Sequence, residues 1–337
     1  MKLLIAYDGS KCSEAAIDDL TRAGLPRDGE ALVVSIAEVW LPPPNGKADT
    51  GINLNEKNEV LMHRQTQEDK RLVAEAQSFA NHVRNRIKRM FPSWLVSSEA
   101  TYGSPAFEIL SLADNLRSDL IVVGSHGRSA IGRIYFGSVS QRVLTEAKCS
   151  VRVARGRIEV EPGPSRIMIG FDGTAGAITA VESVLGRDWP EGSEVRLFSA
   201  LEPVFPTTIG RFLPPVNLAV QDINEHELVW IKEKAAESMG RLTSAGLNPS
   251  LQIKAGNPRY LLIEEAEHWG ADSIFVGANS AGGRFERFLI GSNSAAIAAR
   301  AHCSVEVVRE VSSLIAVTQQ LTGGPNIYGH RNADSCL

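Results

Sequence analysis

The sequence predicts an α/β protein made of two tandem domains, each a doubly wound, five-stranded parallel sheet. Three observations lead to this prediction. Blocks of sequence recur in the same order in the two parts of the 337-residue chain. Short apolar segments alternate with longer segments of helical periodicity, which favours strand–helix–strand units with right-handed crossovers. The short segments are almost continuously apolar, as is typical of parallel strands buried on both faces.

The internal repeat consists of six blocks. They pair residues 2–10 with 166–174, 29–38 with 192–202, 103–105 with 256–258, 119–124 with 272–277, 137–138 with 291–292, and 149–153 with 303–307. The first copy carries about eleven extra residues, which we place in the Pro- and Gly-rich stretch 41–51. A repeat of this length and order indicates a duplicated domain.

The strands and helices follow from the apolar pattern. In the first copy, strands are predicted at 2–7, 31–37, 95–101, 119–124 and 150–154. A long helix is predicted within 56–90, because apolar residues recur there at steps of three and four: Leu72, Ala76, Phe79, Val83, Ile87 and Met90. Two further helices should begin at Pro105 and Pro258, each preceded by a capping side chain, Ser104 or Asn257.

These elements divide the chain into four parts. We expect a first domain over 1–155, a linker over 156–165 that contains two prolines, a second domain over 166–310 and a tail over 311–337. The end of the tail has the composition of a poorly ordered segment.

Composition excludes several classes of partner. A formal net charge of -4 does not suggest a nucleic-acid partner. No apolar run is long enough for a transmembrane helix, and Asp8 interrupts the N-terminus too early for a signal peptide, so a cytoplasmic protein without membrane contact is expected. The four cysteines, which have no metal-ligand spacing, are expected to be buried, reduced thiols: Cys12, Cys149, Cys303 and Cys336.

A candidate phosphate-binding loop follows the fourth strand of the first copy. Gly124, Gly127 and Gly137-Ser138 form the pattern Gly-x2-Gly-x9-Gly-Ser, and Gly137-Ser138 opens a predicted helix. Glycine lets a phosphate approach backbone N–H groups, and a helix N-terminus favours an anion. Arg128 and Arg133 lie within the loop and could screen phosphate charge.

Asp8 leaves the first strand at the same edge of the sheet, where open α/β sheets bind their ligands. It could accept a hydrogen bond from a ribose hydroxyl or an adenine edge. The alternative is a set of tight-turn glycines with no ligand. His126 lies inside the loop, but the sequence places no carboxylate or nucleophile beside it, so a phosphate-adjacent or solvent-facing histidine is favoured over a catalytic one.

Other nucleotide signatures are missing from the sequence. There is no Walker pattern, no Gly-x-Gly-x-x-Gly after either first strand, and no His-x-Gly-His or Ser-Gly-Gly-x-Asp-Ser loop. Nor is there a paired-carboxylate set suited to Mg²⁺-dependent phosphoryl transfer. No catalytic residue and no protein-bound metal site is therefore predicted.

Both copies resemble universal stress protein (Usp) domains, on the Asp-Gly-Ser after strand one, the glycine signature and the closing Cys-Ser-Val strand. The resemblance covers about residues 1–155 and 165–310. It implies an adenine nucleotide α-hydrolase-like fold that binds ATP, with or without Mg²⁺. The positions implied or added as candidates are Asp8, Ser10, Ile36, Gly124, Gly127, Arg128, Gly137 and Ser138.

The second copy departs from the family's glycine pattern. Ser280 stands where the second glycine should be, and the spacing to Gly291 is one residue longer. Gly282 and Gly283 could rebuild a loop. Weaker binding, or none, is therefore expected at the counterpart positions Asp172, Gly277, Gly291 and Ser292.

The expected function is an ATP-binding stress-response protein, a sensor or regulator, with at most weak ATP hydrolysis. The alternatives are an interaction scaffold of the same fold without nucleotide, or a slow ATPase. Usp domains commonly pair through their last strands, here 150–154 and 304–308. The resemblance thus implies an intramolecular pseudo-dimer of the two copies, which would cover two strand edges at once. It leaves open whether a further homodimer forms.

Overall fold

The computed structural model describes residues 1–39, 56–126, 136–155, 163–202, 214–278 and 291–310, the side chains of 56–66, 214–221 and 223 excepted. We call 1–155 the first half and 163–310 the second half. The first half contains β1 (Lys2–Ala6), α1 (Lys11–Asp19), β2 (Glu30–Ala37), α2 (Glu56–Met90), β3 (Leu95–Tyr102), α3 (Pro105–Leu116), β4 (Leu120–Gly124), α4 (Ser138–Glu146) and β5 (Ser150–Ala154). A short 3-10 helix, Leu20–Arg22, follows α1.

The second half repeats this order of elements. It contains β6 (Arg166–Gly170), α5 (Ala175–Leu185), β7 (Glu194–Leu201), α6 (Pro214–Ser244), β8 (Asn248–Ala255), α7 (Pro258–Trp269), β9 (Ser273–Gly277), α8 (Ser292–Arg300) and β10 (Ser304–Val308). Each predicted strand of the first half and the predicted 56–90 helix are present, with ends within a residue of those expected. The predicted α/β fold class is confirmed. The domain boundaries themselves stay predictions.

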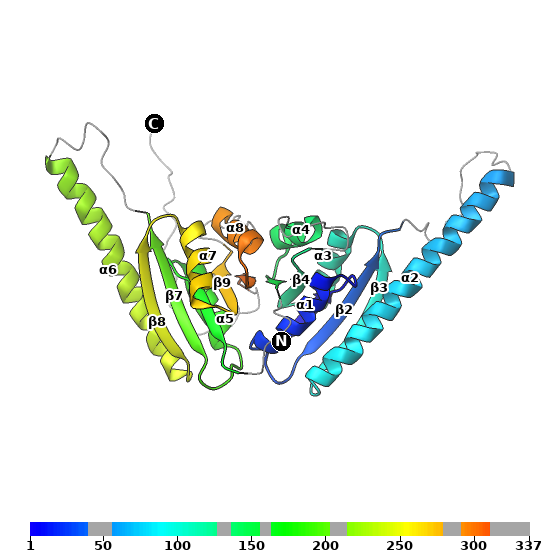
Figure 1. Ribbon diagram of the computed structural model, residues 1–337, viewed down its shortest axis with the longest axis horizontal. Coiled ribbons are helices and arrows are strands. Elements are labelled where there is room, and N and C mark those ends of the chain that lie inside the picture. The colour runs from blue at the N-terminus through cyan, green and yellow to red at the C-terminus, as the bar shows by residue number, and fades with distance from the viewer. Residues whose placement is uncertain (40–55, 127–135, 156–162, 203–213, 279–290, 311–337) are drawn as a thin grey trace, which may run out of the picture.

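The described strands form one ten-stranded sheet in the order β3-β2-β1-β4-β5-β10-β9-β6-β7-β8 (Figure 1). Neighbours within each half are parallel, whereas β5 and β10 are antiparallel. Their register places Val153 opposite Val305, Arg152 opposite Glu306 and Val151 opposite Val307. The prediction that the two last strands pair within the chain is confirmed. We call this β5–β10 junction the seam.

Helices cover both faces of the sheet. Helices α1 and α2 pack on one face of the first half, and α5 and α6 pack on the same face of the second half, each pair over its own apolar cluster. On the other face α3, α4, α7 and α8 share one cluster that crosses the seam through valines of β5 and β10. Figure 1 shows α4 and α8 facing one another at the centre, with α2 and α6 at the outer ends. The core is therefore continuous between the halves on one face only.

Two glycines let a helix approach a strand end closely. A Cβ on Gly124 would lie 2.9 Å from the backbone carbon and oxygen of Cys12 in α1. A Cβ on the counterpart Gly277 would lie 2.5 Å from the backbone of Gly176 in α5. Real Cβ atoms do not make such short contacts, so these positions require glycine for packing whether or not a ligand is bound.

The predicted helix caps have different outcomes. The Asn257 side chain accepts a hydrogen bond from the Arg259 amide, 3.1 Å away, as expected. Ser104 precedes α3, but its side chain makes no capping hydrogen bond, so that prediction is wrong. A hydroxyl is long enough to cap a helix, as Ser10 does at α1, so the difference lies in the orientation of the Ser104 side chain and not in its length. Both prolines occupy the first helical position.

None of the described cysteines forms a disulfide: Cys149 and Cys303 are buried, and Cys12 is half-buried. Burial raises the pKa of the Cys149 thiol to about 12, which keeps it protonated. Cys336, the 41–51 insertion and most of the linker lie outside the described residues. In the part of the chain that the structure covers, no helix meets the length and apolarity that a bilayer span requires.

We predict that Gly277→Ala lowers the free energy of unfolding by about 1–3 kcal/mol, because the added methyl group overlaps the α5 backbone. Gly240→Ala is the matched control, since Gly240 lies within α6 with no atom inside 4 Å of its Cβ position. That substitution should stabilise the protein by up to about 1 kcal/mol. Urea denaturation of both variants gives the measurement. An unchanged free energy of unfolding in Gly277→Ala would contradict the prediction, because it would show that the α5 backbone moves away from the added methyl group at no energetic cost.

Candidate functional site

A cavity of about 570 Å³ opens at the carboxyl ends of β1, β2 and β4 in the first half. Four kinds of segment line it: the ends of these strands, one side of α2, the start of α3 and the N-terminus of α4. Its lining residues include Tyr7, Asp8, Ile36, Phe79, Ile109, Gly124, His126, Gly137 and Ser138. This is the edge at which parallel α/β sheets hold ligands.

Five of the predicted first-half site residues come together on this cavity: Asp8, Ile36, Gly124, Gly137 and Ser138. Ser10 does not line it. Its hydroxyl instead caps α1 by accepting a hydrogen bond from the Ser13 amide at 3.1 Å. Gly127, Arg128 and Arg133 lie outside the described residues.

The turn after β1 holds Asp8 at the cavity wall. Gly9 has a positive φ of 75°, a conformation that glycine adopts without strain. The Ser10 amide donates a hydrogen bond to Oδ1 of Asp8 at 3.0 Å. The carboxylate is thus fixed by its own turn and lies on the cavity wall.

The N-terminus of α4 has the features of an anion site. Gly137 is the N-cap and offers no side chain to the first turn, so the N–H groups there have no capping side chain. The Gly137 amide donates to the Ser125 carbonyl at 2.9 Å, and the Ser140 hydroxyl donates to the Gly124 carbonyl at 2.6 Å. These two bonds hold both ends of the 125–137 loop together. A Cβ on Gly137 would lie 3.3 Å from the Cα of His126.

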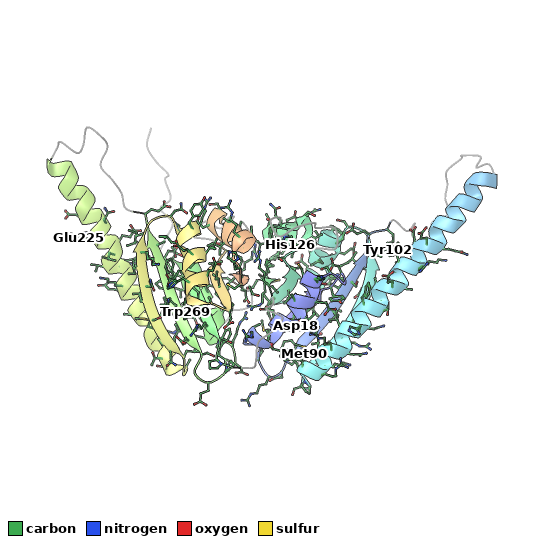
Figure 2. All side chains as sticks on the ribbon, in the orientation of Figure 1. Asp18, Met90, Tyr102, His126, Glu225 and Trp269 are labelled. Carbon is green, nitrogen blue, oxygen red and sulfur yellow. The ribbon has the colours of Figure 1, made fainter. Side chains whose placement is uncertain are left out.

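His126 lies on the cavity wall, close to the middle of the molecule (Figure 2). Its Nδ1 is 3.0 Å from the Ser125 hydroxyl and 3.9 Å from the Cys12 sulfur. Among the described residues, no carboxylate forms a hydrogen bond with this imidazole, and its buried Nε2 has no hydrogen-bond partner. Burial lowers the pKa of His126, and the positive charge of Arg155 lowers it further. The imidazole is therefore neutral at physiological pH, as suits a hydrogen-bonding rather than an ionic contact.

The outer wall of the cavity, which the sequence did not predict, comes from α2. Leu72, Glu75 and Phe79 line the cavity, and Phe79 meets the Tyr7 ring edge-on at 6.1 Å. Leu72 remains 41% exposed although it lies in the apolar series of the helix. The apolar spacing of α2 could have suggested that some of its apolar residues lie outside the core. It could not show that these residues lie beside the ends of the strands.

An ionic network fixes this wall to α1. Arg86 of α2 contacts Glu14 at 2.8 Å and also pairs with Asp18, while Glu14 accepts a hydrogen bond from the Tyr7 hydroxyl. Burial raises the pKa of Tyr7, as does its hydrogen bond to Glu14. Tyr7 is thus a neutral donor that links the cavity wall to the α1–α2 contact.

The corresponding cavity of the second half has a volume of only about 130 Å³. Phe171 and Phe198 line it at the positions of Tyr7 and Val34. The Trp230 ring of α6 lies against the turn after β6, so that a Cβ on Gly173 would approach it to 2.6 Å. The second cavity is therefore smaller, and it differs from the first in having Phe198 where the first half has Val34.

The predicted second-half positions do not come together in that cavity. Asp172 and Gly277 line it, but Gly291 and Ser292 do not. Arg259 of α7 donates to the Ser292 hydroxyl at 2.8 Å and to Oδ1 of Asn293 at 2.7 Å. The start of α8 thus already has a cationic partner from the same half. In the described part of the chain, no cluster of three or more His, Cys, Asp or Glu side chains could hold a metal ion.

Comparison with known proteins gives a family match to both halves. The model of the universal stress protein family matches residues 1–155 and 164–309. The universal stress protein Rv2005c of Mycobacterium tuberculosis is 25% identical over 314 residues, which cover 91% of this chain and 97% of that protein. The universal stress protein MJ0531 of Methanocaldococcus jannaschii is 39% identical over 72 residues, 21% of this chain; the match spans 42% of that relative's length.

A solved structure has a similar fold over most of the chain. A universal stress protein from Archaeoglobus fulgidus superposes with a TM-score of 0.55 at 19% identity, covering 93% of this chain and 97% of that one. This likeness concerns the fold alone. Two successive matches to one family model, together with a relative aligned along nearly its full length, identify the chain as a member of the universal stress protein family in its tandem two-domain form.

Proposed function

We propose that this universal stress protein binds one adenine nucleotide, ATP, in the cavity of the first half and acts as a nucleotide-dependent regulator of a stress response. The observation that carries the proposal is that Asp8, Ile36, Gly137 and Ser138 line a single cavity at the N-terminus of α4. A cytoplasmic location is part of the same proposal.

The chemistry of the cavity supports a nucleotide that lies across it. Apolar side chains from β2, α2 and α3 suit the flat face of a base, for example Ile36, Phe79 and Ile109. Asp8 supplies a fixed acceptor for a ribose hydroxyl or a base edge. The N–H groups at the start of α4, with the Ser138 hydroxyl, suit the phosphates. The apolar side of the cavity therefore suits the base of a nucleotide, and the polar side suits its ribose and phosphates.

The second half is proposed to bind no nucleotide. The small volume of its cavity, the position of Trp230 beside Gly173 and the contact of Arg259 with Ser292 support this view. If Mg²⁺ accompanies ATP, its ligands would be phosphate oxygens and water, because the described residues offer no carboxylate cluster for it.

An interaction scaffold of the same fold is the second candidate, favoured by the closed cavity of the second half. A slow ATPase is the third candidate. ATP turnover above background that is lost in an Asp8→Ala variant would favour the ATPase. A neutral imidazole can act as a general base, but among the described residues no carboxylate is hydrogen-bonded to His126 to orient it for that reaction.

The first test compares Asp8→Asn with Asp172→Asn in the full chain. Asparagine retains the oxygen that accepts the hydrogen bond from the residue two positions on, so the turns should persist. Calorimetric titration with ATP should give a stoichiometry near one. Asp8→Asn should weaken binding by about ten- to a hundredfold, the effect of losing a charged hydrogen bond. Asp172→Asn should leave binding unchanged.

Mass spectrometry of nucleotide retained by the purified protein accompanies this titration. The absence of retained nucleotide together with no measurable ATP affinity would reject the proposal in favour of the scaffold. A stoichiometry near two would instead show that the second half opens to admit a nucleotide.

The second test separates the phosphates from the nucleoside. Ser138→Ala should weaken ATP binding by about tenfold, because one hydroxyl donor to a charged oxygen is lost. It should leave the affinity for adenosine unchanged. Ser292→Ala is the matched control at the start of α8, and neither affinity should change there. An equal loss of ATP and adenosine in Ser138→Ala would place the phosphates elsewhere.

A further inference from the structure

The seam joins two surfaces that are almost identical in sequence. Ser150, Val151, Val153 and Arg155 of the first half have Ser304, Val305, Val307 and Arg309 as their counterparts. Arg155 donates to the Ala298 carbonyl in α8 at 2.6 Å, and Arg309 donates to the Leu144 carbonyl in α4 at 2.6 Å, so this interaction too is duplicated. At the centre the two sides differ in sign, because Arg152 lies opposite Glu306.

The central pair is part of a buried row of alternating charge. Asp19 contacts Arg152 at 2.6 Å, Arg152 contacts Glu306 at 3.5 Å, and Glu306 pairs with Arg187. Arg152 and Glu306 expose none of their side-chain surface. Asp19 and Arg152 belong to the first half, and Glu306 and Arg187 belong to the second. Each half is therefore neutral within the row, and the one ion pair of the row that crosses the seam is Arg152–Glu306.

A homotypic pair, that is, two first halves or two second halves, would replace the attractive Arg152–Glu306 contact across the seam with a repulsive one. Two first halves in the same register would place Arg152 against Arg152, and two second halves would place Glu306 against Glu306. Each Arg152 would keep its Asp19 and each Glu306 its Arg187, but the contact across the seam would be repulsive, and solvent does not screen it because these side chains are removed from water. The observed pairing of first with second half gives opposite charges at the centre of the seam.

A second contact adds a steric restriction. Trp189 of the second half packs on Gly24 of the first half, where a Cβ would lie 2.7 Å from the ring. The counterpart of Gly24 is Asp188, so two second halves would bring each Trp189 against an aspartate. By contrast the peripheral pair Arg22–Asp272, at 2.6 Å, does not discriminate against two first halves, because Asp119 is the counterpart of Asp272. Rejection of that pair therefore depends on Arg152.

We propose that the seam is a heterotypic pairing surface: the first half accepts only a partner with an acid at the position of Glu306, and the second half accepts only a partner with a base at the position of Arg152 and a small residue at that of Gly24. Each half of this chain is the partner that the other requires. The first half does not pair through β5 with the first half of another copy of this chain. The proposal concerns the seam and is independent of nucleotide binding.

The test starts from the folded full chain with a protease site inserted between Arg155 and Gly163, cleaved after purification. Labelled and unlabelled cleaved samples are mixed, and urea is raised until halves exchange between them, then removed. Native mass spectrometry counts the three kinds of pair. We expect first–second pairs, with homotypic pairs at least about a hundredfold below their random share.

Arg152→Gln identifies the charge as the cause. Glutamine keeps a hydrogen-bonding group but removes the like-charge contact, so first–first pairs should appear. For each of them two second halves are left over, which are counted as a second–second pair or as single halves. Arg155→Gln is the matched control, because its counterpart Arg309 is also an arginine. First–first, first–second and second–second pairs lose two, one and none of these contacts, so the exchange of two mixed pairs for one pair of each homotypic kind is unaffected. Thermal melting of both intact variants checks that they fold.

Three results would overturn the proposal. The first is random pairing of the wild-type halves. The second is separation of the cleaved protein into single halves, which would show that the seam does not select a partner without the linker. The third is an equal rise of homotypic pairs in Arg152→Gln and Arg155→Gln. If Arg152→Gln fails to fold, the wild-type distribution still decides between heterotypic and random pairing.

Discussion

The antiparallel pairing of β5 with β10 is the interaction on which the rest of the structure depends. Each half taken separately would expose β5 or β10 as an unpaired edge, with its backbone N–H and C=O groups open to other chains. The pairing satisfies both edges. It also joins the apolar surfaces of α3, α4, α7 and α8 into one cluster through Val151, Val153, Val305 and Val307. Alternation along the strands then leaves Arg152 and Glu306 on the opposite face, where α1 and α5 cover them.

The seam also connects to the candidate site. Arg155 leaves β5, donates to carbonyls near the end of α8, and carries the positive charge that acts on His126 at the cavity wall. The second half thus supplies carbonyl partners for an arginine that influences the first half's loop. A half whose own cavity is small still contributes to the geometry around the open one, and this explains how a closed copy serves the structure.

Much of the fold could be predicted because duplication makes it visible twice. The strand ends, the prolines at the starts of α3 and α7, and the pairing of the last strands all follow from local pattern or from the family resemblance. The sequence could not show why position 124 is a glycine, because a close phosphate and the close backbone of Cys12 require the same residue there. The sequence does not show how far α2 and α6 extend past the strand ends, so it predicts neither the α2 wall of the cavity nor the position of Trp230. Nor does it show that Arg259 contacts the start of α8. The alternating charge needed the register of Arg152 against Glu306, which only the folded sheet supplies.

The direction of the strands carries one last consequence. Since β5 and β10 run antiparallel while neighbours within a half run parallel, the carboxyl ends of β5 and β10 point in opposite directions at the seam. The open cavity and its small counterpart therefore belong to separate sets of strand ends, one in each half. A macromolecule that docks over Asp8 and Ser138 would therefore recognise an opening that the second half, around Asp172, does not reproduce, and it would distinguish the two ends of a molecule whose backbone is nearly symmetric.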